Sequence, residues 1–180
     1  MQTLISGDVS HGGFGGPVLK IGGVDGSAGV WIGGRGGWIL NLAQDHAISI
    51  GGGGYGLVTN HRSPTFLTSD KESTYAAIGY GGLQLEYINR SWNLAHFTVT
   101  SLIGGGGLGL RTSGYDVITD DAETFFVFEP GINLELNITT FFRIMTGISY
   151  RVVSGIDDFG FRDSDFSGIN GTLTLKFGAF

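Results

Sequence analysis

The sequence predicts an all-β fold, an eight-stranded antiparallel up-and-down (transmembrane) β-barrel, on three observations. Eight stretches alternate between bulky apolar side chains and polar or small ones, which is the period of a β-strand. The connections between them run short, short, long, short, long, short, long, as expected when strands cross a membrane back and forth. The 180 residues are 41% apolar and 14% charged, which suits one folded domain. We expect a single barrel over residues 1–180, with residues 1–12 as an irregular N-terminal segment.

The first four strands are predicted at residues 13–23, 27–40, 46–58 and 75–88. Each carries its larger apolar residues on one face and its charged or hydroxyl residues on the other. The apolar face holds Leu19, Ile21, Ile32, Trp38, Ile48, Ile50, Leu83 and Leu85, and the opposite face holds Lys20, Arg35, Ser49 and Glu86.

The last four strands are predicted at residues 92–104, 123–138, 141–153 and 167–178, and the alternation is clearest in the hairpin at 122–153. If the hairpin tip is residues 138–140, Glu135 lies directly opposite Arg143 and Glu129 lies diagonal to Arg151. Pro130 has no N–H to donate to a ladder, so we expect a bulge or a break at that position.

The charge-free face of the strands should point outward. The interior of an eight-stranded barrel is too narrow for so many Phe, Leu, Ile and Tyr side chains, so we expect them to face lipid. The opposite face then lines a closed lumen, where bases and acids neutralise one another. The predicted lumen charge network is Lys20, Arg35, Glu86, Glu129, Glu135, Arg143, Arg151 and Lys176.

Aromatic residues fall near both ends of the predicted strands, as in the two aromatic girdles of membrane barrels. If the chain starts and ends on the periplasmic side, the long connections at residues 59–74, 105–121 and 154–166 are extracellular loops. The periplasmic girdle is predicted to contain Trp38, Tyr87, Trp92, Phe142 and Phe177, and the outer girdle Tyr75, Phe126 and Tyr150.

Several segments resemble known proteins. The overall pattern resembles small outer-membrane barrels of the OmpA and OmpX type, and residues 13–18, 33–38, 51–57, 129–136 and 173–177 are similar to uncharacterised Gly-rich barrels of Gram-negative bacteria related to Bacteroidetes. The second resemblance spans nearly the whole chain and implies a location rather than a reaction. Phe180 departs from the pattern of many such barrels, because it is out of phase with the outward residues of the last strand.

The glycine clusters are typical of strand geometry rather than of a phosphate site, because Gly51 to Gly54 precede neither a Lys-Ser/Thr pair nor a helix. On the inner face, Gly33, Gly37, Gly51 and Gly53 should leave room for long charged side chains from the opposite wall. On the outer face, Gly34, Gly36, Gly52 and Gly54 form a flat patch that indicates either self-association or only barrel curvature.

No catalytic, cofactor or metal site is predicted. The chain has no Cys, and its His residues at 11, 46, 61 and 96 lack metal-ligand spacing; we expect His96 to be a polar lumen residue. His61 with Ser63, Ser69 and Asp70 could meet an acidic loop at the rim as a hydrolase would require, but such residues are common in loops. Asp157, Asp158, Asp163 and Asp165 lack the Gly and the terminal Glu of an EF-hand loop.

The predicted function is therefore that of a non-enzymatic outer-membrane barrel with a plugged polar lumen, acting through its long extracellular loops. Its partners would be outer-membrane lipid and an unidentified extracellular molecule, and the net charge of −6 with scattered Lys and Arg argues against nucleic acid. Met1 to Leu4 do not form a secretory signal, so we expect a mature chain. Two alternatives stay open: a soluble barrel that binds a small apolar ligand, and a Gly-rich homopolymeric filament.

Overall fold

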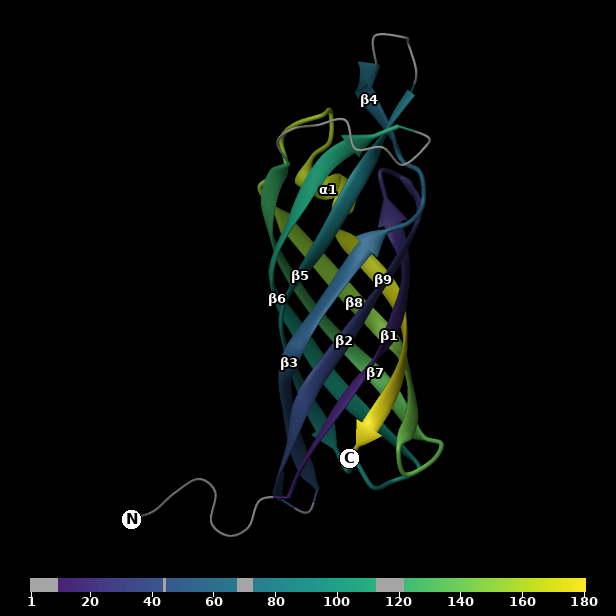
Figure 1. The fold of residues 1–180 in the computed structure, drawn as a ribbon, viewed down its shortest axis with the longest axis vertical. Helices are drawn as coiled ribbons and strands as arrows, with labels where there is room; N and C mark the ends of the chain where they lie inside the picture. The colour runs from purple at the N-terminus through teal and green to yellow at the C-terminus, as the bar shows by residue number, and fades with distance from the viewer. Residues whose placement is uncertain (1–9, 44, 68–72, 113–121) are drawn as a thin grey trace, which may run out of the picture.

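Eight long antiparallel strands form a closed barrel in the computed structural model, which describes residues 10–43, 45–67, 73–112 and 122–180 (Figure 1). Consecutive strands of the barrel pair with each other, and the first barrel strand, His11–Val24, pairs with the last, Gly168–Ala179, to close it. These pairings confirm the predicted fold class. The barrel strands are β1 His11–Val24, β2 Ser27–Ala43, β3 His46–Leu57, β5 Ser73–Asn89, β6 Ala95–Arg111, β7 Glu123–Asn137, β8 Phe142–Ser154 and β9 Gly168–Ala179.

The apolar face of the strands points outward. In the hairpin of β7 and β8, Leu134 is 49% exposed and Ile148 is 58% exposed. Between them in the alternation, Glu135 is 0% exposed and Arg143 is 6% exposed. The barrel is therefore inverted relative to a water-soluble protein, with charges inside and hydrocarbon outside.

Several strand boundaries differ from the prediction by one to seven residues, and two of them are informative. β1 begins at His11, inside the segment predicted to be irregular, because that residue already pairs with Leu40 of β2. β6 continues past the predicted end at residue 104 to Arg111. Its four glycines extend the ladder because they let strands approach closely: a Cβ on Gly104 would lie 2.1 Å from the carbonyl oxygen of Gly81.

Two short elements were not predicted, and both lie at the end of the barrel that carries the long connections (Figure 1). Strand β4, Arg62–Leu67, pairs with β5, and the single-turn helix α1, Asp163–Phe166, packs on β8 and β1. The helix is fixed by a local bond in which Arg162 N donates to Asp165 Oδ2 at 2.8 Å. Four residues are too few to show a helical period in the sequence.

The predicted register of the β7–β8 hairpin is wrong by two residues. Arg143 pairs with Asn137, and Glu135 pairs with Met145. The connection is two residues longer than expected, because Asn137 pairs with Arg143 instead of Phe141. The N–H groups of Ile138 and Thr139 both donate to the carbonyl of Phe142, at 3.1 and 3.0 Å.

Of the two outcomes predicted for Pro130, a bulge or a break, the structure shows a break in the ladder. Pro130 pairs with Ser101 of β6, and the register with β8 is the same on both sides of it. Along β7, pairing with β8 stops at Phe128 and resumes at Gly131, so the ladder is interrupted on the side where the missing N–H would have donated.

The lumen contains two apolar layers with charged residues between them. The layer nearest the chain ends consists of Phe14, Ile39, Ala47 and Ile88, with Phe180 packed against it. Phe180 turns inward from the end of β9, which explains why it is out of phase with the outward residues. The opposite layer includes Trp31, Tyr55, Tyr80, Leu108 and Phe125 of the barrel wall, closed over by Phe161 and Phe166.

Candidate functional site

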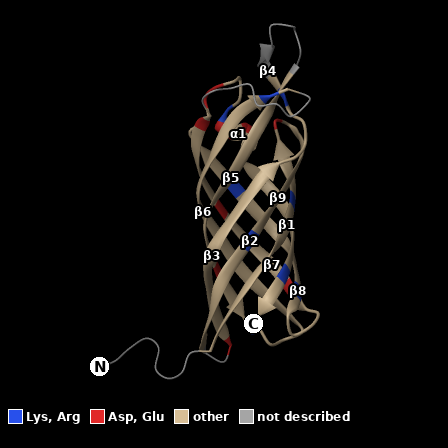
Figure 2. Cartoon of the chain, in the orientation of Figure 1, with Lys and Arg blue, Asp and Glu red and all other residues tan. Residues whose placement is uncertain are grey.

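A chain of ion pairs crosses the part of the lumen nearer the chain ends. Arg35 Nη2 of β2 lies 2.8 Å from Glu86 Oε2 of β5, and the other oxygen of Glu86 lies 2.7 Å from Lys176 Nζ of β9. Lys176 also donates to Glu135 of β7, whose Oε1 lies 3.0 Å from Arg143 Nη1. Five strands are thereby connected through buried charges, and Figure 2 marks the positions of charged residues along the strands.

A second cluster is centred on Glu129 of β7. Lys20 Nζ of β1 lies 2.9 and 2.8 Å from its two oxygens. Tyr80 Oη donates to Glu129 at 2.6 Å, and Ser149 Oγ donates to it as well. The ammonium of Lys20 also lies 3.5 Å from the ring centroid of Tyr55, in a cation–π contact.

Arg151 does not contact Glu129, contrary to the predicted diagonal pair. Its Nε donates to the carbonyl oxygen of Phe166 at 2.6 Å, and its guanidinium lies 4.1 Å from the ring centroid of Trp31. This residue therefore holds α1 in the mouth of the barrel. The prediction failed here because α1 was not foreseen, so the carbonyl that competes for Arg151 was unknown.

For three residues of these clusters, the contacts were not predicted from the sequence. Tyr80 and Ser149 complete the shell of Glu129, and His96 Nε2 lies 3.4 Å from Glu135 Oε1. His96 was expected in the lumen, as a polar residue without a stated partner. The strand alternation could have placed all three inside, since Tyr80 shares its face with Glu86 and Ser149 with Arg143.

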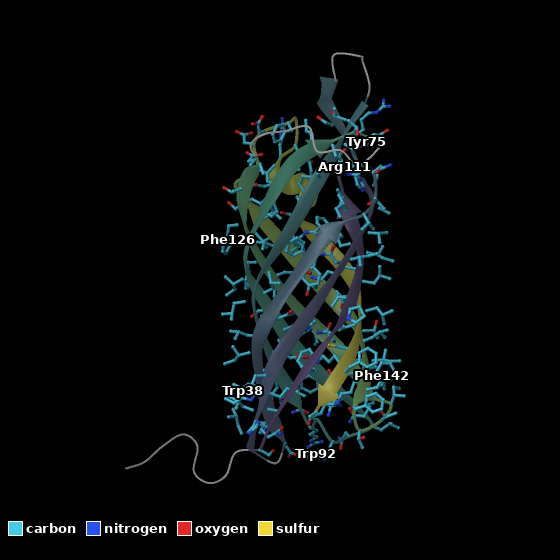
Figure 3. All side chains as sticks on the ribbon, in the orientation of Figure 1. Trp38, Tyr75, Trp92, Arg111, Phe126 and Phe142 are labelled. Carbon is cyan, nitrogen blue, oxygen red and sulfur yellow. The ribbon has the colours of Figure 1, made fainter. Side chains whose placement is uncertain are left out.

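The predicted girdle residues lie at both ends of the barrel. Figure 3 shows Trp38, Trp92 and Phe142 near the end with the chain termini, and Tyr75 and Phe126 near the other. Trp92 belongs to the connection between β5 and β6 rather than to a strand. Trp38, Trp92, Phe126, Tyr150 and Phe177 are exposed, while Tyr75, Tyr87 and Phe142 are partly covered.

Contacts with neighbouring rings explain part of the reduced exposure of Phe142 and Tyr87. Phe142 stacks on Phe177 with ring centroids 4.8 Å apart. The hydroxyl of Tyr87 lies 2.6 Å from Nδ1 of His46, an arrangement suited to the boundary between apolar and aqueous surroundings.

Two of the inner glycines, Gly33 and Gly51, are required by the backbone of the neighbouring strand rather than by charged side chains from the opposite wall. A Cβ on Gly33 would lie 1.9 Å from the carbonyl oxygen of Gly54, and one on Gly51 would lie 1.9 Å from that of Gly36. Gly37 and Gly53 face nearby side chains, Ser49 and the pair of Gln84 and Tyr55. On the outer face, a Cβ on Gly34, Gly52 or Gly54 would have 3.4 Å or more of clearance, while one on Gly36 would lie 2.9 Å from a carbonyl oxygen.

His61 and Ser63 at the rim form hydrogen bonds with other groups. His61 Nε2 lies 2.9 Å from Thr59 Oγ1, and Ser63 Oγ donates to the carbonyl of Phe159 at 2.7 Å. Burial lowers the pKa of His61, and the charge of Asp25 opposes that shift. Ser69 and Asp70 lie outside the described residues.

The acidic loop uses several of its carboxylates to hold its own backbone. Asp163 Oδ1 accepts from Ile156 N at 2.7 Å, and Asp158 Oδ1 accepts from Phe159 N at 2.7 Å. Within the described ranges, no group of three or more His, Cys, Asp or Glu residues could hold a metal ion. In the same part of the chain, no helix is long and apolar enough to span a membrane.

Two solved structures share this architecture. Ail, the attachment invasion locus protein of Yersinia pestis, in complex with the heparin analogue sucrose octasulfate, aligns with a TM-score of 0.54 at 14% identity over 96% of this chain and 98% of its own. Neisserial surface protein A, NspA, aligns with a TM-score of 0.53 at 8% identity over 96% and 99%. The fold is that of the small outer-membrane barrels. No protein-family model and no curated protein matches the sequence, so the resemblance to OmpA, OmpX and Gly-rich Bacteroidetes barrels stays a prediction.

Proposed function

We propose that the protein resides in the bacterial outer membrane as a non-enzymatic barrel with a closed polar lumen, and that its long loops contact a molecule outside the cell. The observation that carries the proposal is the outward apolar face, which runs along the barrel strands. Soluble monomers rarely expose so much contiguous apolar surface. Residues exposed on this face include Ile21, Ile32, Leu83, Phe97, Ile103, Ile132, Leu134, Ile148 and Leu173.

The arrangement of the lumen argues against the soluble ligand-binding alternative. Such a barrel would need an apolar interior, whereas the eight predicted network residues are all buried inside this one. Apolar layers lie on both sides of the charges, including Phe180 below and Phe166 above. We expect the lumen to conduct ions poorly for this reason.

The charge of the loops favours a basic partner. Residues 25–26, 58–72, 112–122 and 155–167 contain ten Asp and Glu but only three Lys and Arg. Several of these acids lie around α1 at the loop end of the barrel (Figure 2). Such a surface repels a sulfated polysaccharide and attracts a cationic macromolecule, with a strength that falls as salt rises. In this respect the chain differs from Ail, whose structure contains a heparin analogue.

Location and lumen closure can be tested on the purified protein. We expect folding only with detergent or lipid, gel migration that changes on heating, and near-baseline conductance in planar bilayers. A protein that is folded and monodisperse without detergent would contradict the membrane location, and large stable channels would contradict the closed lumen.

Binding by the loops can be tested with a Lys-rich peptide and heparin, using the protein in detergent micelles. We expect the peptide to bind with an affinity that falls with ionic strength, and the double variant Asp157→Asn/Asp158→Asn to bind it more weakly. Both side chains are exposed at the rim, so the barrel should stay intact. Preferential binding of heparin would contradict a basic partner.

Self-association through Gly34, Gly36, Gly52 and Gly54 is a separate proposal. All four lie side by side on β2 and β3, where Gly34 pairs with Gly54 and Gly36 pairs with Gly52. The absence of side chains leaves a flat area against which another copy could pack. Cross-linking in lipid, compared with a Gly54→Phe variant, would decide between self-association and simple barrel curvature, and electron microscopy would reveal the filament alternative.

A further inference from the structure

A small cavity lies in the middle of the lumen, between the two charge clusters. It has a volume of about 20 Å³, and its lining includes the charged side chains of Lys20, Arg35 and Glu129 and the polar side chains of Gln84, Asn133 and Thr174, all of them buried. A cavity of this size holds a single guest about as large as a water molecule. The walls are polar and charged, so the cavity is suited to a hydrated or ionic guest rather than an apolar one.

The charges around the cavity do not balance. The charged residues buried in the described barrel are six bases and three carboxylates; one of the bases, Arg111, lies at the loop end of β6 and donates to Asn60, which leaves five bases and three carboxylates deeper in the lumen. Glu129 already accepts hydrogen bonds from Lys20, Tyr80 and Ser149, so its charge is fully engaged with those donors. An uncompensated positive charge in a low-dielectric interior is unfavourable, and a buried anion would offset it.

Two hydrogen-bond donors that line the cavity are underused. Arg35 donates from Nη2 to Glu86, while among the described residues its Nη1 donates only to the sulfur of Met145 at 3.9 Å. Thr174 is 1% exposed, and its Oγ1 has no hydrogen-bond partner among the described residues. A guanidinium and a hydroxyl facing one small cavity are the donor types that bind an anion.

We propose that the central lumen binds one small monovalent anion of the halide class, held by Arg35 and the hydroxyl of Thr174. The anion neutralises part of the positive excess and completes the hydrogen bonds of both donors. The site is separate from the loops, so it does not depend on the surface role proposed above. Large anions such as gluconate do not fit a cavity of this size.

The direct test uses bromide as the probe. Protein refolded and crystallised in sodium bromide should show one anomalous scattering peak in the lumen, within hydrogen-bonding distance of Arg35 and Thr174. A lumen without such a peak, or bromide found only at exposed Arg side chains, would overturn the proposal.

The second test measures unfolding midpoints in urea after refolding in chloride or in gluconate at equal ionic strength. Ligand that binds only the folded state stabilises it, so the wild-type midpoint should be higher in chloride and rise with its concentration. Thr174→Val should remove most of this dependence. Thr146→Val is the matched control, because Thr146 faces outward and should retain the dependence.

Arg35→Met should abolish the chloride effect, and Glu86 keeps Lys176 as a partner in that variant. If Arg35→Met does not fold, the comparison of Thr174→Val with Thr146→Val still decides the question. Equal midpoints in chloride and gluconate for the wild type would refute the anion site and indicate a water molecule instead.

Discussion

Lys20 and Glu129 meet across the lumen from strands β1 and β7, with the ammonium 2.9 and 2.8 Å from the two carboxylate oxygens. Two other strands, β9 and β8, separate β1 from β7 along that side of the sheet. The pair therefore braces the barrel through its interior, independently of the backbone ladders.

Replacing Lys20 with Met should destabilise the barrel strongly. No second Lys or Arg among the described residues forms a salt bridge with Glu129, so the variant leaves a buried carboxylate without its cation. We expect a loss of about 3 to 5 kcal/mol in the free energy of unfolding, measured by urea titration in lipid vesicles.

Arg143→Met is the comparison for Lys20→Met. It removes one cation from Glu135, which keeps Lys176 and the nearby His96. We expect a smaller loss, of about 1 to 3 kcal/mol, corresponding to one hydrogen bond to a charged group. Equal losses of unfolding free energy in the two variants would show that the number of cationic partners of each glutamate does not control stability here.

Glycines on the two faces of β3 should respond differently to alanine. In Gly51→Ala, the new methyl would lie 1.9 Å from the carbonyl of Gly36 and 2.4 Å from Gly37 Cα, so the β2–β3 ladder must separate. In Gly54→Ala, the nearest atom is 3.8 Å away. We expect Gly51→Ala to lose about 1 to 3 kcal/mol or to misfold, and Gly54→Ala to change stability by less than about 1 kcal/mol.

Charge substitutions on the outer face can test the proposed lipid contact. Ile148 lies in the middle of β8 and is 58% exposed, and Ile138 lies in the turn beyond β7 and is 50% exposed. In a bilayer, Ile148→Arg should cost about 2 to 4 kcal/mol and Ile138→Arg about 0 to 1 kcal/mol. Refolding yields and urea midpoints in vesicles report the difference. If both substitutions are neutral, the outer face does not contact hydrocarbon.

The cap at the loop end should depend on Phe166. This side chain is 0% exposed and packs on Phe161 with ring centroids 5.3 Å apart. Phe166→Ala should cost about 3 to 5 kcal/mol if the loop unfolds together with the barrel. Phe126→Ala, on the outer face, serves as the control. A large increase in proteolysis within residues 155–167, without loss of the barrel, would instead show that the cap opens independently.

Period-two alternation, together with the lengths of the connections, was sufficient to predict the barrel, and the eight residues it placed on the inner face are buried. Glu86, Glu135 and Lys176 could be placed inside because each is flanked by bulky apolar neighbours in its strand. Alternation cannot say which residues meet across the lumen. That depends on strand stagger, so Glu129 was assigned to Arg151 on the adjacent strand, whereas it pairs with Lys20 of β1.

The short elements in the loops could not be predicted from the sequence for a different reason. α1 is a single turn stabilised by the carboxylates of its own loop and by Phe161 and Phe166, which no periodic pattern reveals. Without the helix, neither the role of Arg151 nor the apolar cap could be foreseen. The two-residue shift of the hairpin likewise follows from its turn, in which the N–H groups of Ile138 and Thr139 both donate to the carbonyl of Phe142.

The pairing of β1 with β9 has a consequence for biogenesis. The first and last strands of the barrel form one seam, with Leu19 beside Leu173 and Lys20 beside Thr172. A chain whose last strand has not yet been synthesised lacks this seam. Its Lys20 and Glu129 would be exposed to solvent, and so would the apolar outer face of its strands. The polypeptide must therefore be protected from aggregation until its final strand has been synthesised. Closure of the barrel and insertion into the membrane then become a single late event.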